Sequence, residues 1–331
     1  MDSLSRLLAF AIALKLGVHQ IKHYSSEYAI NLLPCYQLLA QQDSLHLVND
    51  AIEQFGVAPH LYLIGTRPRI SMKKGSGQID GNAVKCELEV HQQDERIEVP
   101  CDLQWERLPD GTELKCEYPY TKFVLETPDG NSRLASKWSL MLQGIQPMSP
   151  HLNFDVLYVG QAFGEDGDRN AAERLASHET LQKIYAEAIQ KKPDKEVWLN
   201  LIAFQPPMQI VMFDGRHKGP TDEPEGHDEK FAELDMSWAH QICFAEAAMI
   251  RYFQPEYNKI FKNSFPSQSH VSYAECYDLD LNSVSVEFNT ESLNCTFSSL
   301  SVEPSGLHMI QYALHDRKER VAMFEPFEKT E

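Results

Sequence analysis

Three polar residues interrupt apolar stripes that otherwise have the spacing of amphipathic helices. Arg174 and His178 are four residues apart and therefore share one face of a helix expected over 170–190. Glu246 has isoleucines one turn before and one turn after it, in a helix expected over about 230–253. A carboxylate in an apolar stripe costs several kcal/mol unless it is paired, hydrated or bound to a metal. Arg174 and Glu246 therefore either form a structural ion pair or line a functional site.

Three short segments around these residues follow one another along the chain. Residues 157–161 read L-Y-V-G-Q at the end of an expected strand, 174–178 read R-L-A-S-H on the next helix, and 246–258 read E-A-A-M-I-R-Y-F-Q-P-E-Y-N. In this order they resemble the GIY-YIG nuclease superfamily. The pattern of that superfamily is a strand with G-I-Y, a second strand with Y-[IV]-G, a helix with R-x-x-x-H, a helical Glu and a later Asn. The resemblance covers about 138–263.

The resemblance implies hydrolysis of phosphodiester bonds in nucleic acid, DNA above all, with Mg²⁺ or Mn²⁺ as the cofactor. Such chemistry needs charge stabilisation at the phosphate and an activated water, for which a hard cation and a planar guanidinium are suited. Bacterial defence or restriction-like processing is a setting that the family's range suggests. The resemblance implies that Tyr158 is the tyrosine of the second motif and a proton acceptor, and that Gly160 permits close backbone approach. It implies that Arg174 contacts the scissile phosphate and that His178 supports the tyrosine or the water. Glu246 would bind the metal, and Asn258 would brace the site by hydrogen bonding.

The first motif is where this sequence leaves the family pattern. Gly144-Ile145-Gln146 stands at about the expected offset, in a strand expected over 139–145, so Gln146 replaces the first tyrosine. Glutamine can hydrogen-bond a water molecule, but it cannot serve as a phenolate. Two hypotheses follow: an active endonuclease that relies on Tyr158, or a catalytically degenerate GIY-YIG module that acts in nucleic-acid or protein binding and assembly. An unrelated α/β protein with a chance motif is a third.

The pattern of apolar residues predicts an α+β fold in four regions. A helical N-terminal region over 1–57 and a β-rich region over 58–137 precede the GIY-YIG-like unit at 138–263, and a β-containing extension over 264–331 follows it. The third region predicts the order strand, strand, helix, strand, helix, which the family also has. An acidic loop over 215–229 precedes its last helix.

The charge balance restricts how the chain can bind its partners. Thirty basic and forty-eight acidic residues leave a net charge of −18 among 331 residues, which excludes binding of nucleic acid or anionic membranes by bulk charge. The expected nuclease unit itself has twelve basic and nineteen acidic residues, a net charge of −7. A nucleic-acid site must therefore be a local positive patch or be neutralised by metal ions. The candidates for such a patch are Lys191, Lys192, Lys195, Arg251, Lys259 and Lys262.

The seven cysteines and the start of the chain indicate a cytoplasmic location. The cysteines are odd in number and widely spaced and contain no C-x-x-C pair, so neither a disulfide framework nor a zinc site is expected. The apolar stretch over 7–14 is too short to span a bilayer, so no membrane partner is expected. A protein partner or a second copy could bind through the N-terminal or C-terminal region.

Overall fold

The computed structural model shows a mixed α+β chain in which β-sheets predominate. The α+β class expected from the apolar pattern is therefore confirmed. The structure describes residues 22–135, 143–162, 170–213, 219–234, 236–266, 274–316, 320 and 323. Within these ranges, no helix is both long and apolar enough to cross a lipid bilayer.

A six-stranded sheet forms the centre of the molecule. Its strands lie in the order β16-β15-β11-β3-β12-β2, and β3 pairs antiparallel with both β11 and β12. These strands come from all four expected regions, so the sheet crosses the boundaries placed near 57, 137 and 263. The bounds are β2 Pro34–Ala40, β3 Leu61–Pro68, β11 Phe154–Gln161, β12 Lys195–Phe204, β15 Phe297–Ser299 and β16 Val302–Ser305.

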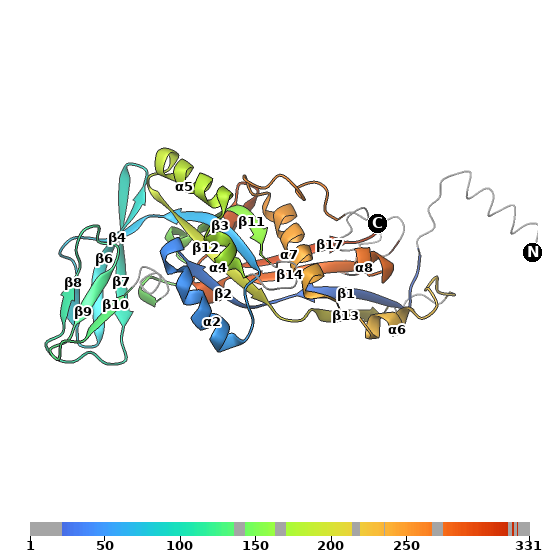
Figure 1. Cartoon of the computed structure of the whole chain (residues 1–331), viewed down its shortest axis with the longest axis horizontal. Helices are drawn as coiled ribbons and strands as arrows, with labels where there is room; N and C mark the ends of the chain where they lie inside the picture. The colour runs from blue at the N-terminus through green and yellow to red at the C-terminus, as the bar shows by residue number, and fades with distance from the viewer. Residues whose placement is uncertain are drawn as a thin grey trace, which may run out of the picture.

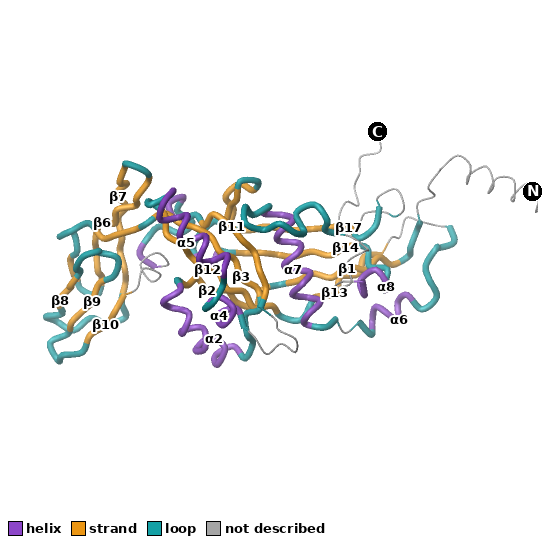
Figure 2. Tube along the Cα trace, turned by 45° about the horizontal axis from the view of Figure 1, so that its top comes forward, coloured by secondary structure: helices purple, strands orange, loops and turns teal. Residues whose placement is uncertain are grey.

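Helices cover both faces of this sheet (Figures 1 and 2). Helices α2, α4 and α5 pack on one face, where Ile64, Leu181 and Leu199 belong to one buried cluster. Helix α7 packs on β3 and β11 from the opposite face. The bounds are η1 (a 3₁₀ helix) Gln42–Leu47, α2 Val48–Phe55, α4 Ala171–Leu175, α5 Glu179–Lys191 and α7 Trp238–Phe253.

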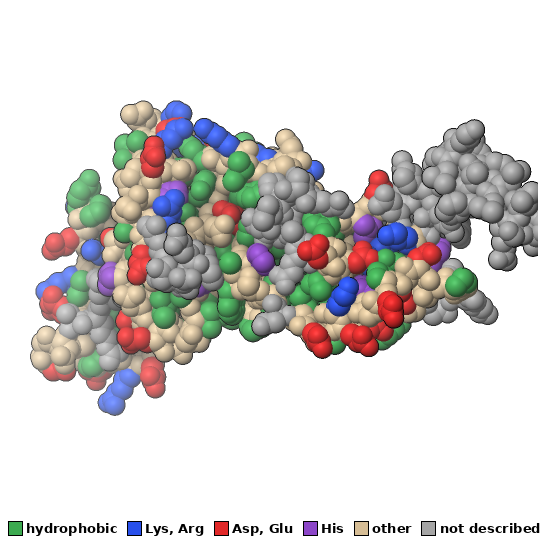
Figure 3. Space-filling model, turned by 45° about the vertical axis from the view of Figure 1, so that its right-hand side comes forward, with side chains coloured by type: hydrophobic (Ala, Val, Ile, Leu, Met, Phe, Trp, Pro, Cys, Tyr) green, Lys and Arg blue, Asp and Glu red, His purple; other side chains and the backbone are tan. Residues whose placement is uncertain are grey.

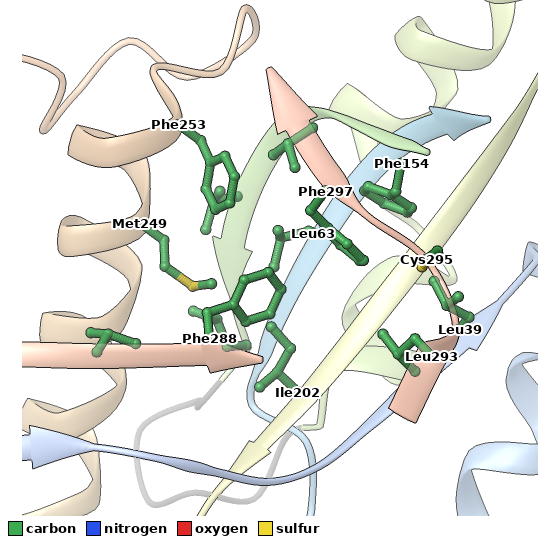
Figure 4. Close-up of a cluster of buried hydrophobic side chains, with 14 of the residues drawn as sticks. Leu39, Leu63, Phe154, Ile202, Met249, Phe253, Phe288, Leu293, Cys295 and Phe297 are labelled. Atoms are coloured by element: carbon green, nitrogen blue, oxygen red, sulfur yellow. The ribbon is translucent and has the colours of Figure 1, made fainter. Parts of the chain in front are cut away.

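A second sheet packs against α7 through β14 and β17. Its order is β13-β1-β14-β17, with bounds β1 Ser26–Leu32, β13 Met208–Phe213, β14 Ser283–Asn289 and β17 Leu307–Ala313. Figure 4 shows Met249 and Phe253 of α7 beside Phe288 of β14 and Phe297 of β15. One continuous hydrophobic core thus joins α7 to both sheets. The described residues also contain the helices η3 Pro150–Leu152, α6 His227–Ala232, α8 Ala274–Asp278 and η5 Glu291–Leu293.

The chain between β3 and β11 forms a separate group of strands, at the left in Figure 1. β6 pairs with β4, β5 and β7, while β8, β9 and β10 form a three-stranded sheet. We call this group the insertion, because it separates two strands that are neighbours in the central sheet. Its bounds are β4 Ile70–Met72, β5 Gln78–Asp80, β6 Ala83–Gln92, β7 Glu95–Gln104, β8 Glu113–Lys115, β9 Phe123–Glu126 and β10 Ser132–Ala135. The β-rich character expected over 58–137 is present here.

A β-bulge in β11 decides which face its tyrosine occupies. Val156 pairs with Gly65 and Tyr158 pairs with Ile64, so Leu157 is an extra residue in β11. Because side chains alternate along a strand, Val156 and Tyr158 would otherwise share a face. The extra residue instead places Val156 in the core on the α7 side and Tyr158 against the cluster under α4 and α5.

The N-terminal region differs most from its expected structure. It was expected to be helical over 1–57, but β1 and β2 occupy much of it, and Pro34 begins β2. Every residue of β1 is buried, so this strand lacks the alternation of apolar and polar residues that marks a half-exposed strand. Residues 4–18, whose apolar residues have helical spacing and contributed to that expectation, lie outside the described residues.

Two expected long helices are each interrupted. The helix expected over 170–190 is divided into α4 and α5, because the His178 side chain accepts a hydrogen bond from the Leu181 N–H and caps a new helix. The helix expected over 230–253 is divided into α6 and α7, with Ser237 as the cap of α7. Part of the acidic loop, 214–218, lies outside the described residues.

Two expected strands are not found where the structure describes them. Residues 143–145, the described end of the strand expected over 139–145, are not in a strand, and β3 is the antiparallel partner of β11 instead. The alternation of residues over 271–276 predicts a strand in the C-terminal extension, but α8 occupies its end, while 271–273 lie outside the described residues.

Close contact between β3 and β11 predicts a large effect of one methyl group at Gly65. A Cβ on Gly65 would lie 2.5 Å from the Asp155 carbonyl oxygen and would also overlap the Phe154 ring. We expect Gly65→Ala to lower the free energy of unfolding by about 2 kcal/mol or more, since backbone must move.

The matched control is Gly56→Ala, measured in the same urea titration. A Cβ there meets nothing within 4 Å, although φ is +70°, so only backbone strain of about 1 kcal/mol is expected. Equal losses for the two variants would contradict the close approach of β3 to β11.

Candidate active site

Two tyrosines from neighbouring strands meet on the face of the central sheet that α4 and α5 cover. Tyr62 of β3 lies opposite Gly160 of β11, and Tyr158 is two residues before that glycine. The ring centroids of Tyr62 and Tyr158 are 6.3 Å apart, and Tyr158 accepts a hydrogen bond from Tyr62. Tyr62 is 1% exposed, whereas Tyr158 remains partly accessible. Tyr158 is therefore the phenol that an external molecule can reach.

Gly160 provides the space that both rings occupy. A Cβ at this position would lie 2.6 Å from the Tyr62 hydroxyl oxygen and 2.7 Å from Cε1 of Tyr158. Any larger side chain would displace one ring or the other. The close approach that the sequence suggested for Gly160 is thus an approach of two tyrosine side chains to the strand.

His178 closes the aromatic group from the side of α5. Its ring centroid lies 5.6 Å from that of Tyr62 and 5.3 Å from that of Tyr158, both in edge-on geometry. Nδ1 accepts a hydrogen bond of 3.2 Å from the Leu181 N–H, which assigns the proton of the neutral ring to Nε2. Burial, followed by the positive charge of Arg174, lowers the pKa of His178. The neutral ring therefore offers a donor at this site and no free acceptor.

Arg174 adds a positive charge beside the tyrosine pair. It occupies the last turn of α4, is exposed, and hydrogen-bonds the Tyr62 hydroxyl. Burial raises the pKa of Tyr62, and Arg174 opposes that rise. The sequence allowed an ion pair between Arg174 and Glu246. In the structure, Arg174 instead contacts the Tyr62 phenol. The solvent-facing part of the guanidinium can meet an anion.

Glu246 of α7 approaches the tyrosines from the end of β11. It hydrogen-bonds the neutral amide of Gln161, and its negative charge raises the pKa of both Tyr62 and Tyr158. Burial raises the pKa of Glu246 itself to about 7. Residues one turn away on either side, Ile242 and Ile250, are each 1% exposed. The carboxyl group is therefore a polar interruption in a buried stripe, as the sequence indicated.

Asn258 holds the strand that carries the second tyrosine. Its Oδ1 accepts from the Val159 N–H at 2.9 Å, and its Nδ2 donates to the Val159 carbonyl oxygen at 2.8 Å. The Tyr257 N–H also donates to the Leu157 carbonyl oxygen at 3.0 Å, so the chain after α7 fastens the bulged part of β11. Asn258 was expected to brace the site. Because both ends of its amide serve the backbone, it is a positioning residue rather than a catalytic one.

Gly144 and Gln146 lie away from this group of side chains. Gln146 is exposed in a loop, and Gly144 packs on the Cys101 sulfur of the insertion. The strand expected to carry them is not present at 143–145. Gln146 therefore does not occupy the position of a second tyrosine, and Gly144 supports the insertion rather than the site.

Tyr62 and Gln161 are the site residues that sequence reasoning missed. The run Leu61 to Ile64 has the pattern of a strand within the β-rich region expected over 58–137, but nothing in the sequence links it to Tyr158 across the long insertion. A signal was present in the alternation Leu61-Tyr62-Leu63, which puts one phenol on the face opposite two leucines. Gln161 directly follows the Y-V-G triplet and was passed over as part of the motif.

The described residues contain no group of three or more His, Cys, Asp or Glu side chains arranged to hold a metal ion. All seven cysteines are free thiols, as expected from their spacing. Glu246 is the site's carboxylate, so a cation here would need oxygen ligands from water or substrate as well. Mg²⁺ ordinarily binds in that way, through one or two carboxylates with several retained waters.

No family model, curated protein or solved structure matches this chain. A function must therefore be inferred from the side chains themselves. Those that meet are two phenols, a neutral imidazole, a guanidinium and a carboxyl group of raised pKa. Such groups, shifted by burial and by one another's charges, are typical of sites that move protons.

The raised pKa of Glu246 predicts a cost in stability that depends on pH. The carboxyl ionises at about pH 4.5 in the unfolded chain and at about pH 7 in the folded one, so stability falls as pH rises between these values. At about 1.4 kcal/mol for each pH unit, the cost above pH 7 reaches roughly 3 kcal/mol. Glu246→Gln should therefore raise the melting temperature at pH 8 and change it little at pH 5.

Glu256→Gln is the matched control, since Glu256 is exposed and follows α7 in the same part of the chain. Its effect on melting should be the same at both pH values. If Glu246→Gln also shifts melting equally at pH 5 and pH 8, Glu246 does not bear an unneutralised charge in the folded protein.

Proposed function

We propose that this chain is a metal-dependent endonuclease of GIY-YIG type that hydrolyses phosphodiester bonds in nucleic acid, with DNA as the favoured substrate. The observation that carries the proposal is the meeting of Tyr62 and Tyr158, from paired strands, with His178, Arg174 and Glu246. These residues lie far apart in the sequence. Their types and order match those of the family's motifs.

Tyr62 is proposed as the first-motif tyrosine in place of Gln146. β3 and β11 are antiparallel neighbours that each carry one of the two tyrosines, and the insertion separates them along the chain. His60 and Leu61 stand where the family has Gly and Ile. With Tyr62 in this role, the site has two tyrosines. The absence of one phenol is therefore no longer a reason to expect a degenerate site, and the acidic charge balance is the sequence-based reason that stays.

Glu246 fits the role of ligand to a divalent cation. Its carboxyl is desolvated and hydrogen-bonds a neutral amide, and its raised pKa shows that its charge is poorly compensated. A cation bound there would relieve that cost, with Gln161 fixing the carboxylate. Mg²⁺ or Mn²⁺ would supply Lewis-acid stabilisation of the phosphate and leaving-group oxygens. The Glu246 carboxylate is close enough to Tyr62 and Tyr158 to raise the pKa of both. A cation bound to Glu246 would therefore lie near Tyr158, the proposed proton acceptor.

Tyr158 is proposed to accept the proton of the attacking water. Burial raises its pKa and the charge of Glu246 raises it further, so Tyr158 is a neutral phenol while that charge stands. Once the charge is neutralised, Arg174 and the hydrogen bond from Tyr62 both favour the phenolate. His178 would have to give up its bond to Leu181 to act as the base, so it is better suited to orient the two rings.

The charges on the surface bear on how nucleic acid would reach the site. Figure 3 shows several Lys and Arg side chains along the upper edge of the molecule, the edge on which α5 lies in Figure 1, and a group of Asp and Glu side chains at the lower right. Lys183 and Lys191 of α5 are exposed, although both approach Glu187. Arg251, one of the expected patch residues, instead donates to the Lys262 carbonyl oxygen and to Asn263. Arg251 is therefore held by the chain that follows α7, which makes it a weaker candidate for a phosphate contact.

A binding module without cleavage activity is the second candidate. The net charge of −18, and −7 within 138–263, favours it, because an acidic chain gains little from bulk attraction to phosphates. In that case Arg174 and the tyrosines would bind a phosphate or a protein partner without turnover. The two candidates differ in one respect, the hydrolysis of the bound strand.

Removal of the Tyr62 hydroxyl tests which residue takes the place of the first-motif tyrosine, Gln146 as the sequence suggested or Tyr62 as the strand pairing suggests. Tyr62→Phe and Tyr158→Phe should each lower the cleavage rate about a hundredfold or more, the scale of a lost proton-transfer group. Gln146→Ala should leave the rate unchanged, because Gln146 is exposed in a loop. Cleavage of plasmid DNA with Mn²⁺ would be followed under single-turnover conditions. Loss of activity in Gln146→Ala with full activity in Tyr62→Phe would contradict the new assignment.

Metal dependence distinguishes the enzyme from the binding module. Cleavage should require Mg²⁺ or Mn²⁺, stop in excess EDTA and be abolished by Glu246→Gln, which keeps the shape of the side chain but weakens cation binding. Affinity for Mn²⁺ should rise with pH through about 7 as Glu246 loses its proton. Binding of DNA with no cleavage under any of these conditions would favour the module.

A further inference from the structure

Two cysteines of the insertion face each other across a pair of antiparallel strands. Cys86 of β6 is directly opposite Cys101 of β7. Directly opposed residues in such a pair have Cα atoms about 4.5 to 5.5 Å apart, which lies inside the range of about 4.4 to 6.8 Å found in disulfides. The two side chains share a face, and Cys86 donates a hydrogen bond to Cys101. The backbone therefore holds both sulfurs where a bond between them can form.

We propose that Cys86 and Cys101 are a redox-active pair that forms a reversible disulfide when the protein meets a hydroperoxide. The pair lies outside the candidate active site, in the insertion between its two motif strands. Neither Cys86 nor Cys101 contributes to the proposed hydrolysis. A cytoplasmic location would keep the pair reduced except under oxidation.

Both thiols are buried, so a hydroperoxide must reach them through a local opening of the insertion, and Cys101 is the member of the pair suited to react first. The hydrogen bond from Cys86 lowers the pKa of the Cys101 thiol, and the thiolate is the form that attacks peroxide. Attack breaks the O–O bond, gives a sulfenic acid on Cys101 and releases one water or alcohol. The Cys86 sulfur then displaces the sulfenic oxygen, which leaves as water, so two thiols lose two electrons to one hydroperoxide.

Strand geometry also indicates that the bond would be reversible. Both cysteines are held by a regular ladder that runs from Ala83–Gln104 to Gln92–Glu95, so the bond could form and break without a change of strand register. Gly144, on the chain that returns from the insertion to β11, packs on the Cys101 sulfur. A sulfur drawn toward Cys86 would loosen that contact.

The test is quantitative thiol mapping of the full-length, fully reduced protein. Samples before and after addition of stoichiometric hydrogen peroxide are alkylated, digested and analysed by mass spectrometry. We expect the Cys86 and Cys101 peptides to lose their alkylated forms together, and one cross-linked peptide to appear that lacks two hydrogens. Dithiothreitol should restore both alkylated peptides.

Cys101→Ser and Cys86→Ser test the order of the steps. Cys86→Ser should leave a sulfenic acid on Cys101 that dimedone traps, and Cys101→Ser should leave little at Cys86. Cys35 provides the control, because it is exposed and stands alone on β2. The wild-type map decides the proposal even if either variant fails to fold. Oxidation of Cys35 while Cys86 and Cys101 remain alkylatable, or a disulfide from either one to Cys116, would overturn it.

Discussion

The antiparallel pairing of β3 with β11, with one extra residue at Leu157, is the constraint on which the candidate site depends. Without the extra residue, Tyr158 would point into the core on the α7 side, away from Tyr62. The bulge is held by hydrogen bonds from Asn258 and Tyr257 to the neighbouring backbone. β-Bulges often re-aim a side chain next to an active site, and this one brings two phenols onto one face.

Physical chemistry explains which parts of this arrangement the sequence could predict. Glu246 was found because a carboxylate between isoleucines in an apolar stripe must be paired, hydrated or bound to a metal. Arg174 and His178 were found because they interrupt the apolar stripe of the helix expected over 170–190. The partner of Tyr158 was not found, because strand pairing is set by contacts across a long insertion that has no local signature. The break between α4 and α5 was missed because a histidine that caps a helix cannot be told from one inside it by spacing alone.

The N-terminal region was misread for a related reason. β1 is buried on both faces, so its apolar residues show no alternation, and periodicity then cannot separate a strand from a helix. The central sheet also takes strands from every expected region, so it crosses the boundaries that were drawn from changes in the apolar pattern. Burial of Tyr62, Tyr158 and Glu246 together is costly, and the surrounding core around α7 and the two sheets offsets that cost. Sites of this kind trade stability for chemistry.

The most direct measurement is nuclear magnetic resonance of the full-length protein with side-chain labels on tyrosine and histidine, titrated with Mn²⁺. A paramagnetic ion broadens the signals of nuclei close to it. Our account predicts that the ring signals of Tyr62, Tyr158 and His178 broaden together at low Mn²⁺, while Tyr118 of the insertion, which is 86% exposed, stays sharp. The same titration of Glu246→Gln should leave all of them sharp. Broadening that spares the two tyrosines, or that persists in Glu246→Gln, would contradict a cation site built on their convergence.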